Sequence, residues 1–205
     1  MSVKVTRMEL LRLKRLRQLA QRARDLLEEK RTVLIMEFLS LVSDFRSLSQ
    51  QLDKLLRVVY ETTTLAEVYM GKTALAGISL GTLNRFIVDT EIRTVMGITL
   101  YKLKLRKLMN LKDVIQYSFL STSPVLDEAL MNMERVLELT VELGGLEASI
   151  KALADELRKI KRRVNVLERV ILPHLDENIR FIEYRLDEME REAQFRIRRL
   201  KQVRL

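Results

Sequence analysis

The chain has no cysteine and no tryptophan, and aromatic residues make up only 5% of its 205 residues. Without cysteine it can form neither disulfides nor thiolate metal sites. A reducing compartment is consistent with this absence but is not required by it. Hydrophobic residues still make up 47% of the chain and charged residues 32%. This composition supplies a continuous apolar stripe on helices and argues against a disordered chain.

Long apolar runs are also missing. No stretch approaches the roughly 18 residues that are needed to span a bilayer. The first twenty positions alternate leucine with arginine and lysine instead of forming the apolar core of a signal peptide. We therefore expect a soluble protein that is not secreted.

Glycine and proline are confined to a few places. All six glycines lie between Gly71 and Gly145, and the only prolines are Pro124 and Pro173. The segments outside these glycines lack a flexible hinge, which favours long helices. We expect an N-terminal coiled-coil arm at residues 1–70, a small central α/β region at residues 71–122 and a C-terminal coiled-coil arm at residues 123–205.

Each arm contains a narrow apolar seam. The spacing alternates strictly between four and three residues, which is the repeat of a coiled coil with one partner helix. The seam of the first arm consists of Leu34, Phe38, Leu41, Phe45, Leu48, Leu52, Leu55 and Val59. The seam of the second arm consists of Leu146, Ile150, Leu153, Leu157, Ile160, Val164, Leu167 and Ile171.

The positions of the two seams indicate that the arms pair with each other. Leu34 has 33 residues before it and Ile171 has 34 after it, so the seams coincide if the arms fold back antiparallel with nearly flush ends. Lys30 and Arg31 break the first seam, and Pro173 interrupts the second at the matching height. We predict a mainly α fold, a long antiparallel two-helix coiled coil with a small central insertion.

Local signals mark where the helices begin. Thr6 and Glu9 form a capping box for the first helix. Ser123 followed by Pro124 is a typical start for the second. Because apolar positions resume at the helical spacing after Pro173, this proline is expected to kink the helix and not to end it.

The central region has a different character. β-Branched residues cluster at residues 87–99, which predicts a short hairpin of strands. A brief helix over residues 108–117 is expected to follow. Residues 100–111 fit a helix equally well, so the end of the hairpin stays open. In the predicted fold this region forms a small knob at the end opposite the chain termini.

Positive charge is concentrated at the two ends of the sequence. The net charge is +9; residues 1–31 carry a net +6 and residues 191–205 a net +5. An antiparallel hairpin brings both segments to one tip, which would favour an acidic partner surface. The basic residues assigned to this tip are Arg7, Arg12, Lys14, Arg15, Arg191, Arg196, Arg198, Arg199 and Lys201.

Two other functions fit a basic coiled coil. Clustered lysine and arginine bind phosphates, so nucleic-acid binding is one alternative; against it, aromatic residues are not interleaved with these charges. The second alternative is a homodimeric scaffold.

Residues that carry out chemistry are sparse. The segment Gly71-Lys72-Thr73 resembles the end of a phosphate-binding loop, but the first glycine of that motif is replaced by Ala66. His174 is the only histidine, and no nucleophile or carboxylate forms a recognisable constellation with it. We identify no catalytic, cofactor or metal site.

Several motifs resemble the D subunit of archaeal A-type and eukaryotic vacuolar ATPases. Residues 162–173 (RRVNVLERVILP) are similar to the signature of that family, and residues 6–10 (TRMEL) to its opening motif. The C-terminal similarity continues through residues 179–182, residues 186–192, residues 195–197 and Lys201.

The resemblance implies a non-catalytic central rotor shaft. Its tip would insert into a head of catalytic A and regulatory B subunits, and its lower part would bind the small F subunit and a collar subunit above the membrane ring. It implies no bound cofactor, and a cytoplasmic location at the periphery of the membrane. The shaft would couple ATP synthesis or hydrolysis to the movement of protons or sodium ions.

Overall fold

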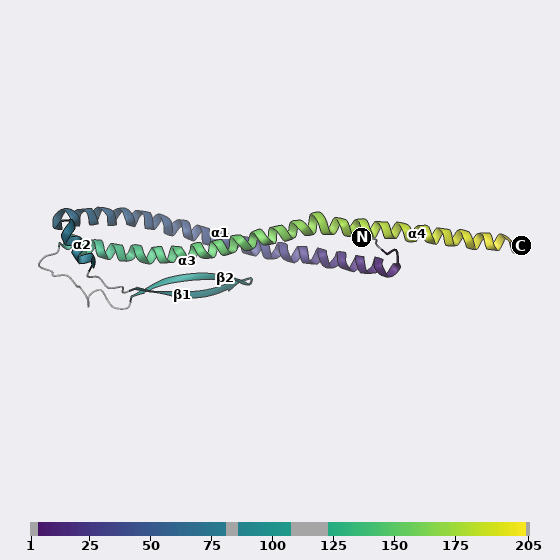
Figure 1. The fold of residues 1–205 in the computed structure, drawn as a ribbon, viewed down its shortest axis with the longest axis horizontal. Coiled ribbons are helices and arrows are strands. Elements are labelled where there is room, and N and C mark those ends of the chain that lie inside the picture. The colour runs from purple at the N-terminus through teal and green to yellow at the C-terminus, as the bar shows by residue number, and fades with distance from the viewer. Residues whose placement is uncertain (1–3, 81–85, 108–122, 204–205) are drawn as a thin grey trace. The chain divides into compact units, whose positions relative to one another are not determined.

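The computed structural model describes residues 4–80, 86–107 and 123–203, which form long helices and one two-stranded antiparallel sheet (Figure 1). The predicted mainly α fold with a central hairpin is confirmed. The chain divides into two compact units. Residues 1–33 and 157–205 form one, here called the terminal unit, and residues 34–156 form the other, here called the central unit.

The first helix, α1, runs from Arg7–Met70, 64 residues without interruption. At its start the Thr6 hydroxyl accepts a hydrogen bond from the Glu9 backbone N–H at 3.2 Å. The Thr6 N–H donates to the Lys4 carbonyl at 3.1 Å, so only one half of the expected capping box is formed. At its end Gly71 has φ +78°, a left-handed conformation that closes a helix and suits glycine.

A short helix, α2 (Lys72–Leu80), follows Gly71 directly. The Leu75 N–H donates to the Gly71 carbonyl at 3.3 Å and so forms its first turn. The sequence pattern predicts no helix at this point. Nine residues are too few for helical periodicity to stand out.

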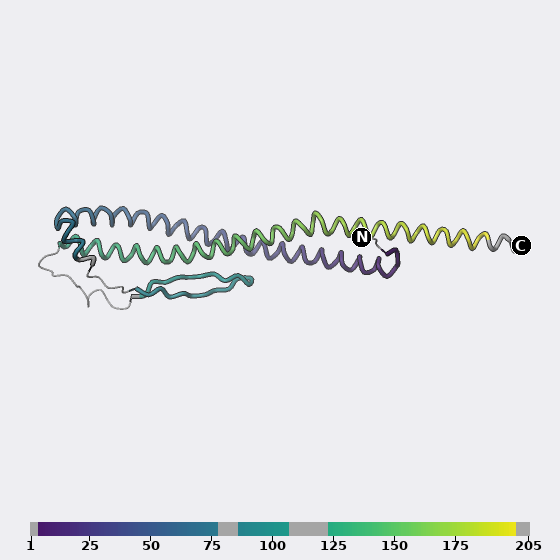
Figure 2. The backbone as a smooth tube through the Cα atoms, in the orientation of Figure 1, coloured from purple at the N-terminus to yellow at the C-terminus, as the bar shows by residue number. Residues whose placement is uncertain are grey.

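In the terminal unit, the first part of α1 lies antiparallel beside α4 (Leu172–Val203) (Figure 2). Three ion pairs join the two helices. Arg7 pairs with Glu190, Lys14 with Glu183 at 2.7 Å, and Arg17 with Asp176 at 2.7 Å. As residue numbers fall along α1 they rise along α4, which is the antiparallel order.

These ion pairs show that the expected flush register is wrong. Flush ends would place Arg7 beside Arg198, whereas Arg7 meets Glu190 and α4 continues past the start of α1. Pro173 lies within one turn of Asp176, close to the level of Arg17 and away from Lys30 and Arg31. The acids Asp176, Glu183 and Glu190 recur every seven residues, so the charged flank of α4 meets the basic α1 in this register.

The second long helical stretch contains a π-helical segment. It consists of α3 (Pro124–Val166), η2 (Leu167–Ile171) and α4. In η2 the Leu172 N–H donates to the Leu167 carbonyl, five residues back. Pro173 has no N–H and cannot make the α-helical bond to the carbonyl four residues before it, so a wider turn here loses little.

The π-helical segment shifts the phase of the buried face by one residue. Ile160 and Val164 are buried before it, and Leu175, Ile179 and Ile182 after it. The seam step from Leu167 to Leu175 is eight residues, one more than a heptad, and Ile171 between them is 38% exposed. The extra residue in the π turn turns the later apolar positions back to the buried side.

Only some of the predicted seam side chains are buried. Five predicted seam residues are buried, namely Leu34, Val59, Leu153, Ile160 and Val164. Ile171 is exposed, and the remaining seam residues are half-buried. Truncation of a half-buried residue such as Leu48 or Leu157 therefore removes less packing than truncation of Leu153, which is fully buried.

The hairpin consists of β1 (Phe86–Val95) and β2 (Ile98–Lys107). Val95 pairs with Ile98 across the two-residue turn Met96-Gly97. Both turn residues have positive φ, 50° and 82°, the type I′ geometry that matches strand twist. The second strand extends to Lys107, so the helical alternative for residues 100–107 is wrong: cross-strand pairing outweighs the helix propensity of leucine and lysine. The helix expected at 108–117 lies outside the described residues.

The start of α3 follows its sequence signal. The Leu126 N–H donates to the Ser123 carbonyl at 2.9 Å, and the Val125 N–H is 3.4 Å from the Ser123 hydroxyl oxygen. Pro124 occupies the first helical position, where its missing N–H leaves no intrahelical bond unmade.

The phase shift at η2 yields a prediction. Deletion of Val170 together with Pro173→Ala should convert η2 to α-helix and leave Leu175, Ile179 and Ile182 on the buried side. We expect the free energy of unfolding to stay within about 1 kcal/mol of the parent value, because the seam phase is preserved and the proline is gone.

The control is deletion of Lys161 from the regular α-helix. It should rotate every later seam residue by about 100° and cost about 3 kcal/mol or more by exposing buried side chains. Circular dichroism during chemical denaturation measures both variants. Equal losses for the two deletions would contradict the rephasing role of η2.

Candidate functional site

The described parts of the chain carry two candidate surfaces for interaction with partners. Within residues 4–80, 86–107 and 123–203, no group of three or more histidine, aspartate or glutamate residues is placed to hold a metal ion. His174 is exposed on α4, with Nδ1 3.1 Å from the Asn178 side-chain amide. In the same parts of the chain, no helix has the length and apolarity that crossing a membrane requires.

The first candidate surface is the basic part of the terminal unit. Several of its predicted cations are paired. Arg7 and Lys14 bind acids of α4, as described above. Arg12 lies 3.5 Å from the Glu9 carboxylate and Arg196 3.0 Å from that of Glu192. Because Arg7 is 79% exposed and Glu190 55%, such pairs contribute at most about 1 kcal/mol each. They do, however, neutralise the charge along α1.

Four predicted basic residues make no ion pair with any described residue, namely Arg15, Arg191, Arg198 and Arg199. Three of them lie on α4 beyond Glu190. The side chain of Lys201 lies outside the described residues. The structure therefore does not bring the two basic segments together at equal height, and three of the four predicted basic residues without an ion pair lie on the C-terminal part of α4.

Apolar side chains lie among these cations. Met189 is 57% exposed, Phe195 68% and Ile197 56%. Phe195 departs from the sequence-based expectation that no aromatic residue is interleaved with the charges. The end of α4 is thus a mixed basic and apolar surface.

Farther along the terminal unit, a hollow of about 380 Å³ lies beside the π-helical segment. Its walls are Leu27 of α1 and, from the other stretch, Arg162, Arg163, Val166, Leu167 and Ile171. Almost all of the exposed surface that lines the hollow is apolar. Val166 in its wall is 49% exposed, and Val170 in the π-helical segment is 60% exposed. Close by, the Arg24 guanidinium binds Asp25 at 2.6 Å, and this hydrogen bond raises the pKa of Arg24.

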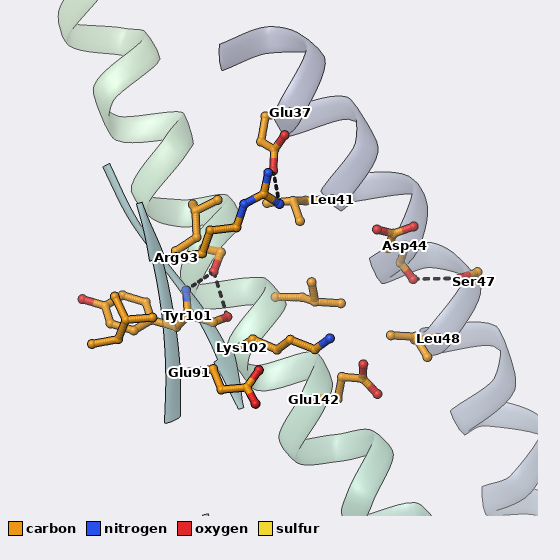
Figure 3. A pocket seen from close by; sticks show the side chains of 14 residues that line it. Glu37, Leu41, Asp44, Ser47, Leu48, Glu91, Arg93, Tyr101, Lys102 and Glu142 are labelled. Atoms are coloured by element: carbon orange, nitrogen blue, oxygen red, sulfur yellow. Dashed lines mark hydrogen bonds and ion pairs between the residues drawn. The ribbon is translucent and has the colours of Figure 1, made fainter. Parts of the chain in front are cut away.

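The second candidate surface is in the central unit, where the hairpin lies beside α3 and the Arg93 side chain extends to α1 (Figure 3). A half-open pocket of about 560 Å³ lies there. Glu37, Leu41, Asp44, Ser47 and Leu48 of α1 form one wall, and Glu142, Leu146 and Ser149 of α3 another; the hairpin supplies Glu91, Ile92, Arg93, Leu100, Tyr101 and Lys102. The Arg93 guanidinium reaches across to Glu37 at 3.4 Å.

A buried serine holds β2 against α3. Ser149 is 1% exposed. Its hydroxyl accepts a hydrogen bond from the Tyr101 N–H at 2.8 Å and lies 3.1 Å from the Tyr101 carbonyl and 2.9 Å from the Gly145 carbonyl, to which it can donate. One side chain thus lies within hydrogen-bond distance of both outward-facing backbone groups of Tyr101, and its single proton is shared between the Tyr101 and Gly145 carbonyls.

Gly145 allows this close approach. A Cβ added at this position would lie 2.9 Å from the Leu103 backbone nitrogen and 3.1 Å from the Tyr101 carbonyl oxygen. α3 continues without a break through the Gly144-Gly145 pair. The signal that was missed is the four-residue spacing of Gly145 and Ser149, which puts two small residues on one helix face.

Ion pairs also cross the hairpin itself. Lys104 binds the Glu91 carboxylate, and Arg106 lies 3.2 Å from that of Asp89. The hydrogen bond from Lys104 lowers the pKa of Glu91 below its ordinary value of 4.5. Because the pKa of Glu91 is lower in the folded state, the ion pair stabilises the hairpin above pH 4.5, and this contribution is lost as the pH falls through the lower pKa of the folded state.

The two neighbouring glycines give a matched pair of variants. Gly145→Ala should lower the free energy of unfolding by about 1–3 kcal/mol, because the new methyl group would overlap backbone atoms of β2. Gly144→Ala meets no atom within 4 Å and should raise helix stability by up to about 1 kcal/mol.

Thermal unfolding and amide exchange at Tyr101 and Leu103 measure both effects. Only Gly145→Ala should speed exchange at these two amides, since only it displaces β2. If both variants are equally stable and equally protected, the close contact does not hold the hairpin.

Comparison with known proteins adds independent information. The family model described as the ATP synthase D subunit matches residues 9–202. The chain is 40% identical to the A-type ATP synthase D subunit of Pyrococcus furiosus over 201 residues, covering 98% of this chain and 94% of the relative. It is 39% identical to that of Pyrococcus abyssi over 203 residues, covering 99% and 95%, and 35% identical to that of Methanopyrus kandleri over 201 residues, covering 98% and 86%.

Proposed function

Because this chain belongs to the ATP synthase D-subunit family, we propose that it is the central rotor shaft of an A-type ATP synthase. In this role it couples ATP synthesis or hydrolysis in a catalytic head to rotation of a membrane ring and ion movement. It performs no chemical step itself. The observation that carries the proposal is the unbroken α1 helix of 64 residues with its buried apolar side chains.

A shaft must resist bending and twisting, and helix packing supplies that resistance. Bends in helices arise at proline, at glycine or at π turns. α1 contains no proline or glycine. In the other stretch, Pro173 and η2 are followed by Leu175, Ile179 and Ile182, all buried again. Both stretches therefore retain a packed face, which supports a mechanical role.

We assign the partners as the catalytic A and regulatory B subunits of the head, the small F subunit of the stalk and a collar subunit that leads to the membrane ring. The chain would then lie on the cytoplasmic side, at the periphery of the membrane and without spanning it. Nucleic acid is not an expected partner, because Arg7, Lys14 and Arg17 are occupied by acids of α4.

We assign contact with the head to the mixed basic and apolar end of α4. Arg191, Arg198 and Arg199 lie there without an ion pair to any described residue, and Met189, Phe195 and Ile197 are exposed beside them. Cations without internal partners can bind acidic groups of another chain at no cost in broken pairs, and apolar side chains add buried area.

The first test concerns coupling. Leu153→Ala and Ile160→Ala each remove a fully buried side chain and should cost about 2–5 kcal/mol in unfolding free energy. In the assembled complex we expect ATP hydrolysis to continue while ion translocation per ATP falls. Leu39→Ala, at a position that is 60% exposed, is the control and should leave both unchanged.

Native mass spectrometry would establish that each variant is still incorporated. A variant that is incorporated, has lost helix stability and still translocates ions at the parent ratio would argue against the shaft role.

The second test concerns docking. Reversing charge with Arg198→Glu and Arg199→Glu should raise the dissociation constant for the catalytic head at least tenfold, about 1.4 kcal/mol. The loss should shrink as salt is added, because screening weakens exposed charges. Arg57→Glu reverses an exposed charge in the central unit and should change affinity little. Equal effects of the two substitutions would mean that the end of α4 is not the docking surface.

A further inference from the structure

The two edges of the hairpin differ. Along β2 the outer edge is covered by α3, through the Ser149 hydroxyl at Tyr101 and the Gly145 contact at Leu103. Along β1, which runs for ten residues, no outward backbone group is hydrogen-bonded to a described residue. A free strand edge of this length is a ready template for another strand.

The pairing fixes which backbone groups of β1 point outward. Both backbone groups of Tyr101 face away from β1, because they bind Ser149, and Tyr101 is directly opposite Ile92. Ile92 is therefore in a non-hydrogen-bonded pair, and its N–H and C=O point to the free edge. The alternation of antiparallel strands gives Val88, Thr90 and Thr94 the same outward orientation.

One face of the hairpin adjoining this edge is apolar and exposed. Phe86, Val88 and Ile92 of β1 lie on that face and are 40%, 47% and 66% exposed. Tyr101 of β2 lies opposite Ile92 and is 39% exposed. Side chains of an added strand that point to the same side would cover these residues. The edge and the face together fit an extended segment in which alternate residues are apolar.

The other face carries charges that describe the occupant further. β1 contributes Asp89 and Glu91, and β2 contributes Lys104 and Arg106, which pair diagonally across the strands with Glu91 and Asp89. The acidic strand is therefore flanked by basic residues on one side only. A strand added to its free side is best matched by lysine or arginine at the positions facing Asp89 and Glu91.

The same charges disfavour a second copy of this chain. The outward backbone groups of two β1 strands could hydrogen-bond to each other in an antiparallel arrangement. Two registers give the longest overlap between the strands. One register places Asp89 opposite Glu91 of the second copy. The other places Glu91 opposite itself and Asp89 opposite Arg93, but the Arg93 guanidinium already pairs with Glu37. Like charges directly opposite are destabilising.

We propose that the free edge of β1 binds an extended segment of another subunit of the complex, which adds a third strand with alternating apolar and basic residues. Main-chain hydrogen bonds to Val88, Thr90, Ile92 and Thr94 supply the register, and the exposed apolar face supplies buried area. The inference depends on the hairpin and on membership of a complex, and it holds whether or not the chain acts as a rotor shaft.

Residue-resolved amide exchange of the unmodified protein tests this directly. In the isolated chain, the outward amides of Val88, Thr90, Ile92 and Thr94 should exchange fast, and inward amides such as those of Glu91 and Arg93 slowly. In the assembled complex, we expect the four outward amides to slow at least tenfold. Outward amides that exchange as fast in the complex as in the isolated chain would overturn the proposal.

A pair of variants tests the same edge by affinity. Thr90→Pro removes an outward N–H and leaves the inward ladder intact, since proline is tolerated on a free strand edge. It should raise the dissociation constant of the chain from the complex at least tenfold, and Thr90→Ala should raise it less than twofold. Slow exchange at Glu91 and Arg93 in the isolated Thr90→Pro variant checks that the hairpin is intact.

Three results would count against a third strand from another subunit. With the hairpin intact, Thr90→Pro and Thr90→Ala could bind equally well. The outward amides could be protected in the isolated chain at high concentration while its mass doubles, which would identify a second copy as the occupant. The outward amides could also be protected in the complex while the thiol of an Ile92→Cys variant still reacts with a labelling reagent. That result would show that no added strand covers the apolar face.

Discussion

A helix that packs through a narrow seam has to keep that seam on one side over many turns, and the rest of this structure follows from that constraint. An α-helix has 3.6 residues per turn and a heptad seam needs 3.5, so small phase errors accumulate unless the helices supercoil or the count is corrected. Here the correction is η2. Its extra residue absorbs the step from Leu167 to Leu175, and Pro173 favours the wider turn because it has no N–H to donate. The exposed Ile171 marks the position where the old phase ends.

The same constraint explains the small residues in the middle of α3. This helix has a seam face, with Leu146, Ile150 and Leu153, and it also has to receive β2 on a neighbouring face. A second layer of large side chains would separate the backbones. Gly145 and Ser149 instead let β2 approach to van der Waals distance, and the serine hydroxyl replaces the strand partner that β2 lacks on that side. α3 thus packs on two faces: one carries the small residues Gly145 and Ser149, and the other carries the large apolar residues of the seam.

The elements that depend on local sequence could be predicted from it. The long helices, the start of α3 at Pro124 and the hairpin follow from spacing, capping chemistry and β-branched residues. The register between α1 and α4 could not be obtained from apolar spacing, because a heptad seam fits equally well after a shift by a whole heptad. The seven-residue recurrence of Asp176, Glu183 and Glu190 carried the missing information, and the ion pairs with Arg7, Lys14 and Arg17 use it. The length of β2 and the role of Gly145 depend on tertiary pairing, so no local pattern specified them.

The distribution of charge bears on how the proposed docking surface would work. Counting residues suggested one cationic tip of summed charge, but the described ion pairs neutralise several cations of α1 and leave Arg15 on α1 and Arg191, Arg198 and Arg199 on α4 without an ion pair. These cations lie among Met189, Phe195 and Ile197. Charge attraction decays over about 8 Å at physiological salt, whereas burial of apolar surface does not depend on that decay. A mixed surface would therefore be attracted to an acidic partner from a distance and be held, once in contact, chiefly by its apolar side chains.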